Sequence, residues 1–237
     1  KVHGVQTFQG KLSHNMDIKV VVWENEFNYS KLNNFGVQFA TGKYYIFLNN
    51  DVEMIGTDWI LRLSGDCHRN KVGVTGVKLY YPDDTVQHAG IVIGIGGSKR
   101  GIAANMFQGL PREEHGYQNR ASLQADYSAV TAACMMVKKD VFDAVDGFTE
   151  KLQVAFNDVD FCLKVRKKGY LVMYDPKIEG YHYESKSRGA ENTPEKVRRF
   201  QGEIDTFRVL WKDILKDGDP YYNRNFSLVS NQYLLGK

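Results

Sequence analysis

The stretch KYYIFLNNDVE, residues 43–53, decides how the rest of the sequence is interpreted. Its first part, residues 44–48, is a run of large apolar side chains, which is typical of a buried strand. The run ends abruptly at Asn49, Asn50 and Asp51, polar residues of the kind that favour turns. The stretch therefore predicts a buried strand that carries three polar side chains to one edge of a sheet.

The segments around this stretch alternate between strand and helix patterns. The predicted elements are buried strands at residues 17–23 and 72–78, and helices at residues 28–42 and 57–67. Asn28 or Ser30 can cap the first of these helices. Because strands and helices alternate, the sequence predicts an α/β fold with a mostly parallel sheet flanked by helices. In such sheets, ligands bind beyond the carboxyl ends of strands, which is where Asn49, Asn50 and Asp51 lie.

The second half of the chain contains the same two patterns. The predicted elements are a hairpin at residues 83–95, a long loop to about residue 126, strands at 127–137 and 170–174, and helices at 139–145, 156–168 and 195–215. Residues 180–193 are polar and contain glycine and serine, which predicts a flexible segment. We expect one domain at residues 1–216 and an extended C-terminal arm at residues 217–237.

Composition narrows the class of protein. The chain has 237 residues, of which 43% are hydrophobic and 25% charged, and this excludes a disordered or fibrous protein. A net charge of +3 without a dense basic patch predicts no nucleic-acid binding. Three widely spaced cysteines fit neither a disulfide framework nor a zinc site, so we expect a reducing compartment. The sequence has no run of about 18 apolar residues, so we expect no membrane span.

The polar end of the 44–48 strand has two interpretations. Asn and Asp favour turns, so Asn49, Asn50 and Asp51 can simply end the strand. Alternatively, the Asp51 carboxylate and the neighbouring amides can hold Mg²⁺ or Mn²⁺, which prefer oxygen ligands and share their coordination shell with substrate phosphates. The residue types alone leave both interpretations open.

Asp158 and Asp160 lie at the predicted start of a helix. Carboxylates are stabilised there by the free backbone N–H groups and by the helix dipole, so both residues can be structural. One of them can instead be a general base that takes a proton from an attacking hydroxyl group. Phe156 and Phe161 would then shield the carboxylate from water and raise its pKa.

Three further segments carry candidate polar residues. His182 is either an ordinary core or surface histidine or a metal ligand. His88 is interpreted as structural, within the predicted hairpin. Arg188, with Lys186 and Ser187, can fold over a diphosphate or form a solvated loop.

The order of these motifs resembles family 2 glycosyltransferases of the GT-A fold, closest to those that build rhamnose-containing and other surface polysaccharides. The resemblance covers roughly residues 17–215. It rests on five runs in this order: FNYSKLNNFGVQFATGKYYIFLNNDVE, GVTGVKLYYPDDTVQHAGIVIGIGG, YSAVTAACMMVKKDVFDAVDGFTE, VAFNDVDFCLKVRKKGY and YHYESKSRG.

The resemblance implies roles for residues at the matching positions. Asp51 would hold the divalent metal, Mn²⁺ or Mg²⁺, that bridges the two donor phosphates. Asn49 stands where the first Asp of the family's DxD motif is expected, which leaves one fewer charge on the metal. His182 would complete the metal shell. Asp158 would be the catalytic base, and Asn157 occupies the first position of the acidic pair.

Other residues are implied on the donor and acceptor sides. Asn34, together with Gly36, resembles a helix start near the donor. Asn50 and Arg188 would also contact the donor. Asp160 would orient the helix or lie on the acceptor side.

The resemblance further implies an inverting transfer from a nucleotide-sugar donor (UDP, GDP or dTDP) to a saccharide or lipid-linked saccharide acceptor. We expect a cytoplasmic location at the inner face of the membrane, with peripheral association through a larger protein. Members of the family normally begin with a strand, a helix and a second strand before the segment at Asp17. Residues 1–16 are too short for that unit, so we expect the chain alone to show little or no turnover.

Two alternative functions remain. One is a non-catalytic binding or assembly module inside a larger synthase. The other is a nicotinamide-binding oxidoreductase, which shares the alternating pattern. The second is disfavoured because no GxGxxG motif follows the first predicted strand, and the glycines at 94, 96 and 97 follow a hairpin and do not open a helix.

Overall fold

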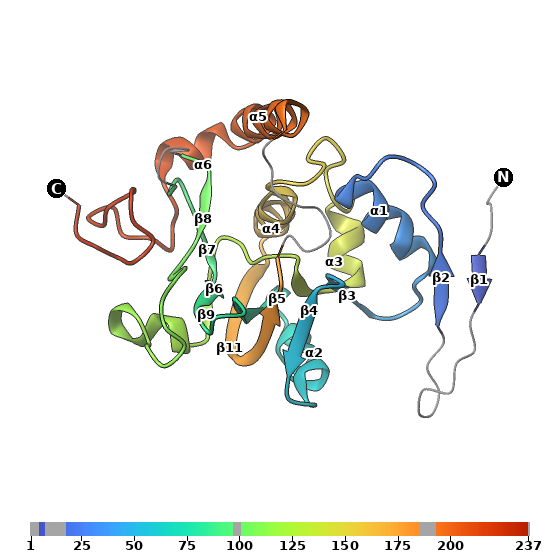
Figure 1. Ribbon diagram of the computed structural model, residues 1–237, viewed down its shortest axis with the longest axis horizontal. Helices are drawn as coiled ribbons and strands as arrows, with labels where there is room; N and C mark the ends of the chain where they lie inside the picture. The colour runs from blue at the N-terminus through green and yellow to red at the C-terminus, as the bar shows by residue number, and fades with distance from the viewer. Residues whose placement is uncertain (1–4, 8–17, 97–100, 185–192, 237) are drawn as a thin grey trace.

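The computed structural model describes residues 5–7, 18–96, 101–184 and 193–236. A central sheet has helices on both of its faces, and two small sheets lie beside it (Figure 1). The strands of the central sheet are β3 (Tyr44–Leu48), β4 (Val52–Ile55), β5 (Val72–Tyr80), β6 (Val86–His88), β9 (Ala125–Asp126), β10 (Cys134–Lys138) and β11 (Leu171–His182). The small sheets pair β1 (Val5–Thr7) with β2 (Lys19–Val21) and β7 (Ile91–Ile93) with β8 (Ala103–Asn105). The helices are α1 (Tyr29–Gly36), η1 (Val37–Phe39), α2 (Trp59–His68), η2 (Tyr117–Ser122), α3 (Lys139–Ala144), α4 (Asn157–Lys167), α5 (Pro194–Leu210) and α6 (Lys212–Asp217).

The predicted α/β class, with helices flanking a sheet, is confirmed, but the strand directions are mixed and not mostly parallel. The main strand order is β3-β10-β5-β11-β4, with β6 added beside β5 and β9 beside β11. Only β5 and β11 form a parallel pair in this described sheet. β10 begins opposite Leu48, at the end of β3, and so runs backwards between β3 and β5. After β5 the chain leaves the central sheet, and it returns at β10, which pairs with β5 in the opposite direction. A local sequence pattern does not encode this return.

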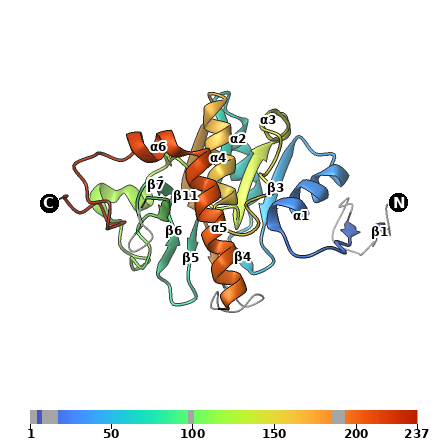
Figure 2. The same cartoon turned by 90° about the horizontal axis from the view of Figure 1, so that it is seen from above.

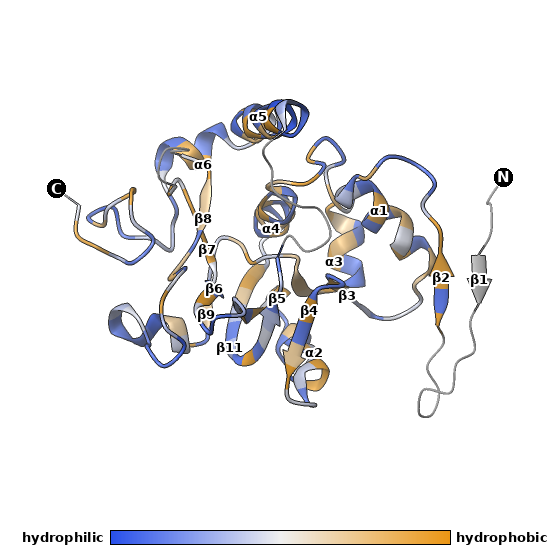
Figure 3. Ribbon diagram, in the orientation of Figure 1, coloured by the Kyte–Doolittle hydropathy of each residue, from blue (hydrophilic) through white to orange (hydrophobic). Residues whose placement is uncertain are grey.

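The core lies on both faces of the sheet. Helix α4 covers one face with α5 packed above it, and α2 covers the other face (Figures 1 and 2). The larger cluster of buried side chains includes Phe148 and Phe161, whose rings lie 4.8 Å apart. The smaller cluster joins Leu63 of α2 to Val77 of β5. Helix α5 carries both hydrophobic and hydrophilic residues along its length (Figure 3), as expected for a helix with one face on the core.

Close packing at the centre of the sheet depends on a glycine. Every residue of β5 is buried, because β10 and β11 pair on its two sides and helices cover it. A Cβ atom at Gly76 would lie 2.5 Å from the Cβ of Val130. The segment before β10 can therefore cross β5 only where the side chain is absent.

Several predicted boundaries are confirmed, and the caps explain them. The strand at residues 44–48 is observed as predicted, and the helix that follows Asp58 begins at Trp59. Asn28 caps α1, because its Oδ1 accepts a hydrogen bond from the backbone N–H of Lys31 at 2.9 Å. Gly169, with φ of +88°, follows α4 as the sequence indicates.

The prediction of a buried strand at residues 17–23 is wrong. Only Lys19–Val21 form a strand, and it pairs with β1 and with no other described strand. Val20 is 42% exposed and Val22 is 52% exposed. A β-branched run indicates a preference for extended backbone but does not supply the partner that buries it.

Three later elements also differ from the predictions. β11 continues to His182 through an irregularity between Asp175 and Glu179, so the strand is longer than residues 170–174 and enters the predicted flexible segment. The strand predicted at 127–137 shortens to β10. The single helix predicted at 195–215 divides at Trp211, whose φ of −123° departs from helical values.

Residues 218–236 fold back onto the middle of the chain. Tyr222 and Tyr233 are buried, and the Tyr233 ring lies 5.4 Å from that of Phe107. The Asp219 carboxylate accepts a hydrogen bond from the backbone N–H of Ile93 at 2.7 Å. The domain boundary at residue 216 stays a prediction.

Membrane-spanning character is absent from the helices that the structure describes. None of them combines the length and the apolar composition that crossing a bilayer requires.

Asp66 on α2 predicts a pH-dependent stability. Burial, together with the neighbouring carboxyl of Asp175, raises the pKa of Asp66 from 3.8 to about 6. The native state therefore keeps a proton that the unfolded state releases, so stability falls as pH rises through about 6. We expect Asp66→Asn to increase the free energy of unfolding above pH 6 and to have less effect below it, in urea titrations on both sides of that pH. An equal effect at all pH values would contradict this assignment.

Candidate functional site

A cavity of about 740 Å³ lies at the edge of the sheet where β3 ends. It receives residues from α1, from the turn between β3 and β4, from the segment before β10, from the start of α4 and from the end of β11. The lining residues are Phe27, Tyr29, Leu32, Asn33, Leu48, Asn49, Asn50, Asp51, Thr131, Ala132, Ala133, Val154, Asn157, Asp158, His182 and Glu184. The cavity thus brings together Asp51, Asp158 and His182, which are far apart in the sequence.

Strand pairing brings Asp51 beside His182. Residues 49–52 form a turn in which the Val52 N–H donates to the Asn49 carbonyl at 3.3 Å. The chain then enters β4, whose Val52 pairs with His182 at the end of β11. The Tyr183 N–H donates to the Asp51 carbonyl at 2.9 Å and extends this ladder by one step. The turn interpretation of residues 49–51 is therefore correct, and it is the turn that presents Asp51 to His182.

The His182 ring has a hydrogen-bond pattern that fixes its tautomer. Its Nδ1 lies 2.7 Å from Oε1 of Gln87, an atom that can only accept, so Nδ1 carries a proton. The amide nitrogen of the same Gln87 donates to the His182 carbonyl at 3.2 Å, which fixes the orientation of the amide. In the neutral ring Nε2 is then unprotonated, and Nδ2 of Asn49 lies 3.4 Å from it.

The same Nε2 atom lies 3.2 Å from Oδ1 of Asp51. This oxygen is buried and makes no hydrogen bond within the described residues. A carboxylate oxygen and an unprotonated ring nitrogen repel each other unless a cation stands between them, which is either a proton on Nε2 or a metal ion. The arrangement, with Nδ1 anchored on Gln87, is the one that metal-ligating histidines adopt.

The donor set fits a divalent metal only in part. Among the described residues, no group of three His, Cys, Asp or Glu side chains could hold a metal ion. Asp51 and His182 supply two ligands, and the remaining positions would have to come from water or from a substrate. Mg²⁺ and Mn²⁺ sites that share phosphate oxygens with a substrate are of this incomplete kind.

Asp158 enters the cavity from the first turn of α4. Its two carboxylate oxygens accept hydrogen bonds from the backbone N–H groups of Val159, at 2.8 Å, and Ala132, at 3.2 Å. Burial raises the pKa of the Asp158 carboxyl, while these N–H groups and the Thr131 hydroxyl oppose the shift. The group is a carboxylate held in one orientation and made more basic than an exposed aspartate.

The residue before α4 has an unusual backbone. Phe156 has φ of +62°, a left-handed conformation that is uncommon for a bulky residue. Its ring packs 5.7 Å from Phe200 and 5.6 Å from Phe207, both on α5. Helix α5 thereby holds a strained turn that sets the direction of α4 and of Asp158.

Asn34 is not among the residues that line the cavity, and its expected contact with the donor stays a prediction. Its amide nitrogen donates to the Phe148 carbonyl at 2.9 Å, and its Oδ1 accepts from the Phe148 N–H at 2.9 Å. The amide is therefore used in joining α1 to the loop after α3. The preceding Asn33 lines the cavity instead, because neighbouring residues on a helix point in different directions.

The position of Asn34 predicts a change in stability without a change at the cavity. Asn34→Ala removes both hydrogen bonds to Phe148 and is expected to lower the free energy of unfolding by about 1–3 kcal/mol. Chemical denaturation measures this loss, and Asn33→Ala is the matched variant at the cavity wall. A decrease in ligand affinity for Asn34→Ala at temperatures where it stays folded would contradict the structural role.

Asp160 is also not among the residues that line the cavity, and its expected place on the acceptor side stays a prediction. It is 1% exposed, and its Oδ1 accepts a hydrogen bond from the Trp211 indole N–H at 2.8 Å. Its Oδ2 lies 3.7 Å from Nζ of Lys164. Asp160 therefore joins α4 to the junction of α5 and α6.

The remaining predicted residues are placed as follows. Asn49 and Asn50 line the cavity. Arg188, with its neighbours Lys186 and Ser187, lies outside the described residues. His88 is buried in the hairpin, as predicted, with Nδ1 2.7 Å from Oδ1 of Asn105. Burial lowers the pKa of His88 to about 4.

Two polar residues beside His182 were not predicted from the sequence. Gln87 is 4% exposed and contacts both Nδ1 and the carbonyl of His182. Glu184 lines the cavity and lies 3.4 Å from the Gln87 amide nitrogen. Gln87 directly precedes His88, and a polar pair within an apolar hairpin was the available signal.

Two relatives match most of this chain, and both are much longer proteins. "Uncharacterized protein y4gI" of Sinorhizobium fredii (strain NBRC 101917 / NGR234) is 45% identical over 219 residues, which are 92% of this chain and 24% of the relative. "O-antigen biosynthesis protein RfbC" of Myxococcus xanthus is 33% identical over 211 residues, which are 89% of this chain and 16% of the relative. The chain thus spans less than a third of either relative. No protein-family model matches the chain.

A solved structure with a similar arrangement of elements identifies the fold. The crystal structure of GalNAc-T7 with UDP, GalNAc and Mn²⁺ matches 82% of this chain and 36% of its own chain, with a TM-score of 0.58 and 13% identity. At this level of identity the similarity concerns the fold alone. Together with the central sheet and its flanking helices, it shows that this chain has a glycosyltransferase-like GT-A fold.

Proposed function

We propose that this chain is a metal-dependent inverting glycosyltransferase domain, which transfers a sugar from a nucleotide-sugar donor to a saccharide acceptor in cell-surface polysaccharide synthesis. The observation that carries the proposal is the meeting of Asp51, Asp158 and His182 at one cavity. The GT-A fold and the similarity to an O-antigen biosynthesis protein support it. A UDP, GDP or dTDP donor and a free or lipid-linked saccharide acceptor belong to the same proposal, as does a cytoplasmic location.

The residues that would hold Mn²⁺ or Mg²⁺ are Asp51 and His182. Oδ1 of Asp51 is the buried oxygen without a hydrogen bond, and Nε2 of His182 faces it at 3.2 Å. When bound, the ion supplies positive charge that stabilises the diphosphate leaving group. Asn49 and Asn50, on the same turn, would contact the donor, and Arg188 is proposed to do so from beyond the described residues.

Asp158 is proposed as the general base. The acceptor hydroxyl oxygen forms a bond to the anomeric carbon on the face opposite the nucleotide, and the bond from that carbon to the diphosphate oxygen breaks. The hydroxyl proton passes to the Asp158 carboxylate, which burial makes a stronger base. The N–H groups of Val159 and Ala132 hold the carboxylate in place during the transfer. A diphosphate leaves without protonation, so a second acid is not needed.

Calorimetry with UDP-, GDP- and dTDP-sugars, each with and without Mn²⁺, tests the proposal. We expect one nucleotide class to bind in the presence of Mn²⁺ and to lose most of its affinity in EDTA. Equal binding with and without the ion would contradict the metal-dependent role. Absence of binding of every donor would contradict the glycosyltransferase proposal.

A second candidate function is a donor-binding or assembly module without catalysis. The observation that favours it is the asparagine at positions 49 and 157, where the family pattern has acids. Donor binding without any release of nucleotide, in the presence of Mn²⁺ and a range of saccharide acceptors, both by this chain and by a longer protein that contains it, would support this second function.

A further inference from the structure

A second cavity, of about 430 Å³, lies beside β5 and the irregular middle part of β11. Its lining includes Lys78 and Tyr80 from β5, Glu179 from β11, and Arg112 from the loop before η2. It shares no lining residue with the cavity around Asp51. Since alternate residues of a strand point to opposite faces, Glu179 and His182 lie on opposite faces of β11.

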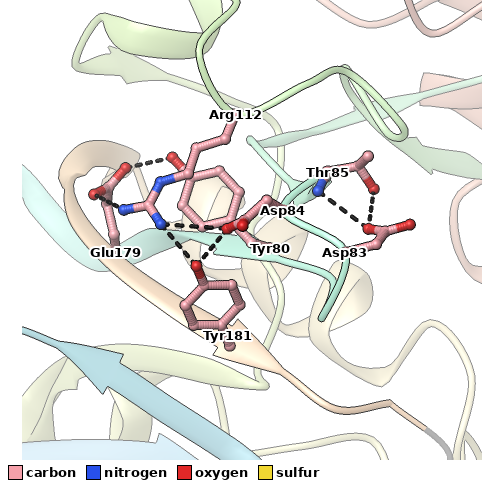
Figure 4. Close-up of polar contacts among 7 residues, drawn as sticks. All are labelled: Tyr80, Asp83, Asp84, Thr85, Arg112, Glu179 and Tyr181. Carbon is pink, nitrogen blue, oxygen red and sulfur yellow. Dashed lines mark hydrogen bonds and ion pairs between the residues drawn. The ribbon is translucent and has the colours of Figure 1, made fainter.

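Two of the five Lys, Arg and Glu side chains that line this second cavity, Arg112 and Glu179, are paired with each other (Figure 4). The Arg112 guanidinium donates to the Tyr181 hydroxyl at 2.7 Å and lies 3.4 Å from the Glu179 carboxylate. The other Glu179 oxygen accepts a hydrogen bond from the Tyr80 hydroxyl. The guanidinium carbon is also 4.8 Å from the centre of the Tyr80 ring. Arg112 and Glu179 therefore neutralise each other.

Lys78, Lys177 and the acidic Glu113 line the cavity outside this network, and of these three Lys78 is the buried one. It is only 3% exposed, and its Nζ makes no hydrogen bond or ion pair with any residue in the described part of the chain. Its Nζ lies 5.2 Å from the centroid of the Tyr80 ring. Although the residue as a whole is buried, its Nζ opens onto the cavity and is solvated there, and the Glu179 carboxylate acts on it without a direct hydrogen bond. Burial lowers the pKa of Lys78, the charge of Glu179 opposes this, and Arg112 adds to it.

We propose that this second cavity binds a phosphate group carried by a small molecule, with Lys78 as its main charge partner. Lys177, Ser122 and His115 line the same cavity and offer single donors. Separate single donors suit a tetrahedral phosphate, whereas the planar fork that would select a carboxylate belongs to Arg112 and is already used by Glu179 and Tyr181. The cavity volume falls in the range of small-molecule sites, so it has room for an organic part beside the phosphate.

This inference does not depend on the proposed sugar transfer. The alternative is that Lys78 has only a structural role and stabilises the fold through its contact with the Tyr80 ring. The two assignments differ in what Lys78→Met does. If Lys78 is kept for a ligand, the apolar replacement removes a charge that has no direct partner and leaves the free protein as stable as before or more stable. If Lys78 is structural, the same replacement destabilises the protein.

The experiment titrates the whole chain with inorganic phosphate and with glucose 1-phosphate, in EDTA and at constant ionic strength, by calorimetry and by thermal unfolding. Acetate is the carboxylate reference. We expect saturable binding of one or both phosphates, and the stronger ligand tells whether free phosphate or a phosphate ester is the natural occupant. Lys78→Met should weaken that binding by about 10-fold to 100-fold, the effect of one charge-assisted hydrogen bond.

Two matched variants complete the test. Lys177→Met, at the rim of the same cavity, should weaken phosphate binding less than Lys78→Met does. Lys43→Met, which lines a different cavity, should leave it unchanged. Absence of saturable phosphate binding to the unaltered chain overturns the proposal, even if Lys78→Met does not fold. Acetate binding as tight as phosphate binding, or unchanged phosphate binding in Lys78→Met, also overturns it.

Discussion

In any form of the protein that shows turnover, this chain alone or within a longer protein, replacing Asp158 by Asn is expected to lower the rate of sugar transfer by about 10²–10⁴-fold, the usual contribution of a general base. The substitution keeps the shape of the side chain and an oxygen that can accept from the backbone N–H groups of Val159 and Ala132. It removes only the ability to take a proton. Donor affinity, measured by calorimetry, should therefore stay near that of the unaltered chain while turnover is lost.

The pH profile gives an independent measure of the same role. The base must be ionised, so activity falls as pH decreases through the pKa of Asp158. Because burial raises this pKa, the acid limb of kcat/KM should lie above the range of an exposed aspartate. Asp160→Asn is the matched control, since Asp160 lies two residues further along α4 and contacts Trp211 outside the cavity. An unchanged rate in Asp158→Asn, or the same loss in Asp160→Asn, would contradict the assignment.

Local patterns predicted the elements whose partners lie nearby. The strand at residues 44–48 and the helix after Asp58 are observed as predicted, because side-chain type and capping decide them within a few residues. The reversed direction of β10 and the exposure of β2 depend on which strand pairs with which. That choice is made by contacts distant in sequence, which periodicity does not report.

In the candidate site, too, some residues were predicted from the sequence and others were not. The resemblance to a known family predicted that Asp51, Asp158 and His182 would meet, and one cavity brings them together. It also implied ligand-side roles for Asn34 and Asp160, and neither lines this cavity, since a motif gives the position on a helix but not the direction in which the side chain points. Gln87 was missed because a polar residue in an apolar hairpin indicates that it has a partner but does not indicate which residue that partner is.

The second prediction with a large expected effect concerns the pair Asp51 and His182. Asp51→Ala and His182→Ala should each remove most of the Mn²⁺-dependent affinity for the donor, because each takes away one of the two protein atoms that face each other at 3.2 Å. The double variant should be little worse than either single variant, since a shared ion is lost in all three. Calorimetry in Mn²⁺ and in EDTA measures the three affinities.

Gln87→Leu tests whether the arrangement of Asp51 and His182 depends on the hydrogen bond between His182 and Gln87. The glutamine holds Nδ1 of His182 at 2.7 Å and so keeps Nε2 turned toward Asp51. Loss of such a partner typically weakens metal binding by about 10–100-fold, so the variant should raise the Mn²⁺ concentration needed for donor binding and leave the affinity at saturating Mn²⁺ nearly unchanged. Asp58→Ala is the control, because its exposed ion pair with Arg62 is distant from the cavity lining. If Asp51→Ala and Gln87→Leu both bind donor with the same Mn²⁺ dependence as the unaltered chain, the atoms that meet at the end of β11 form a structural contact and the metal-dependent mechanism fails.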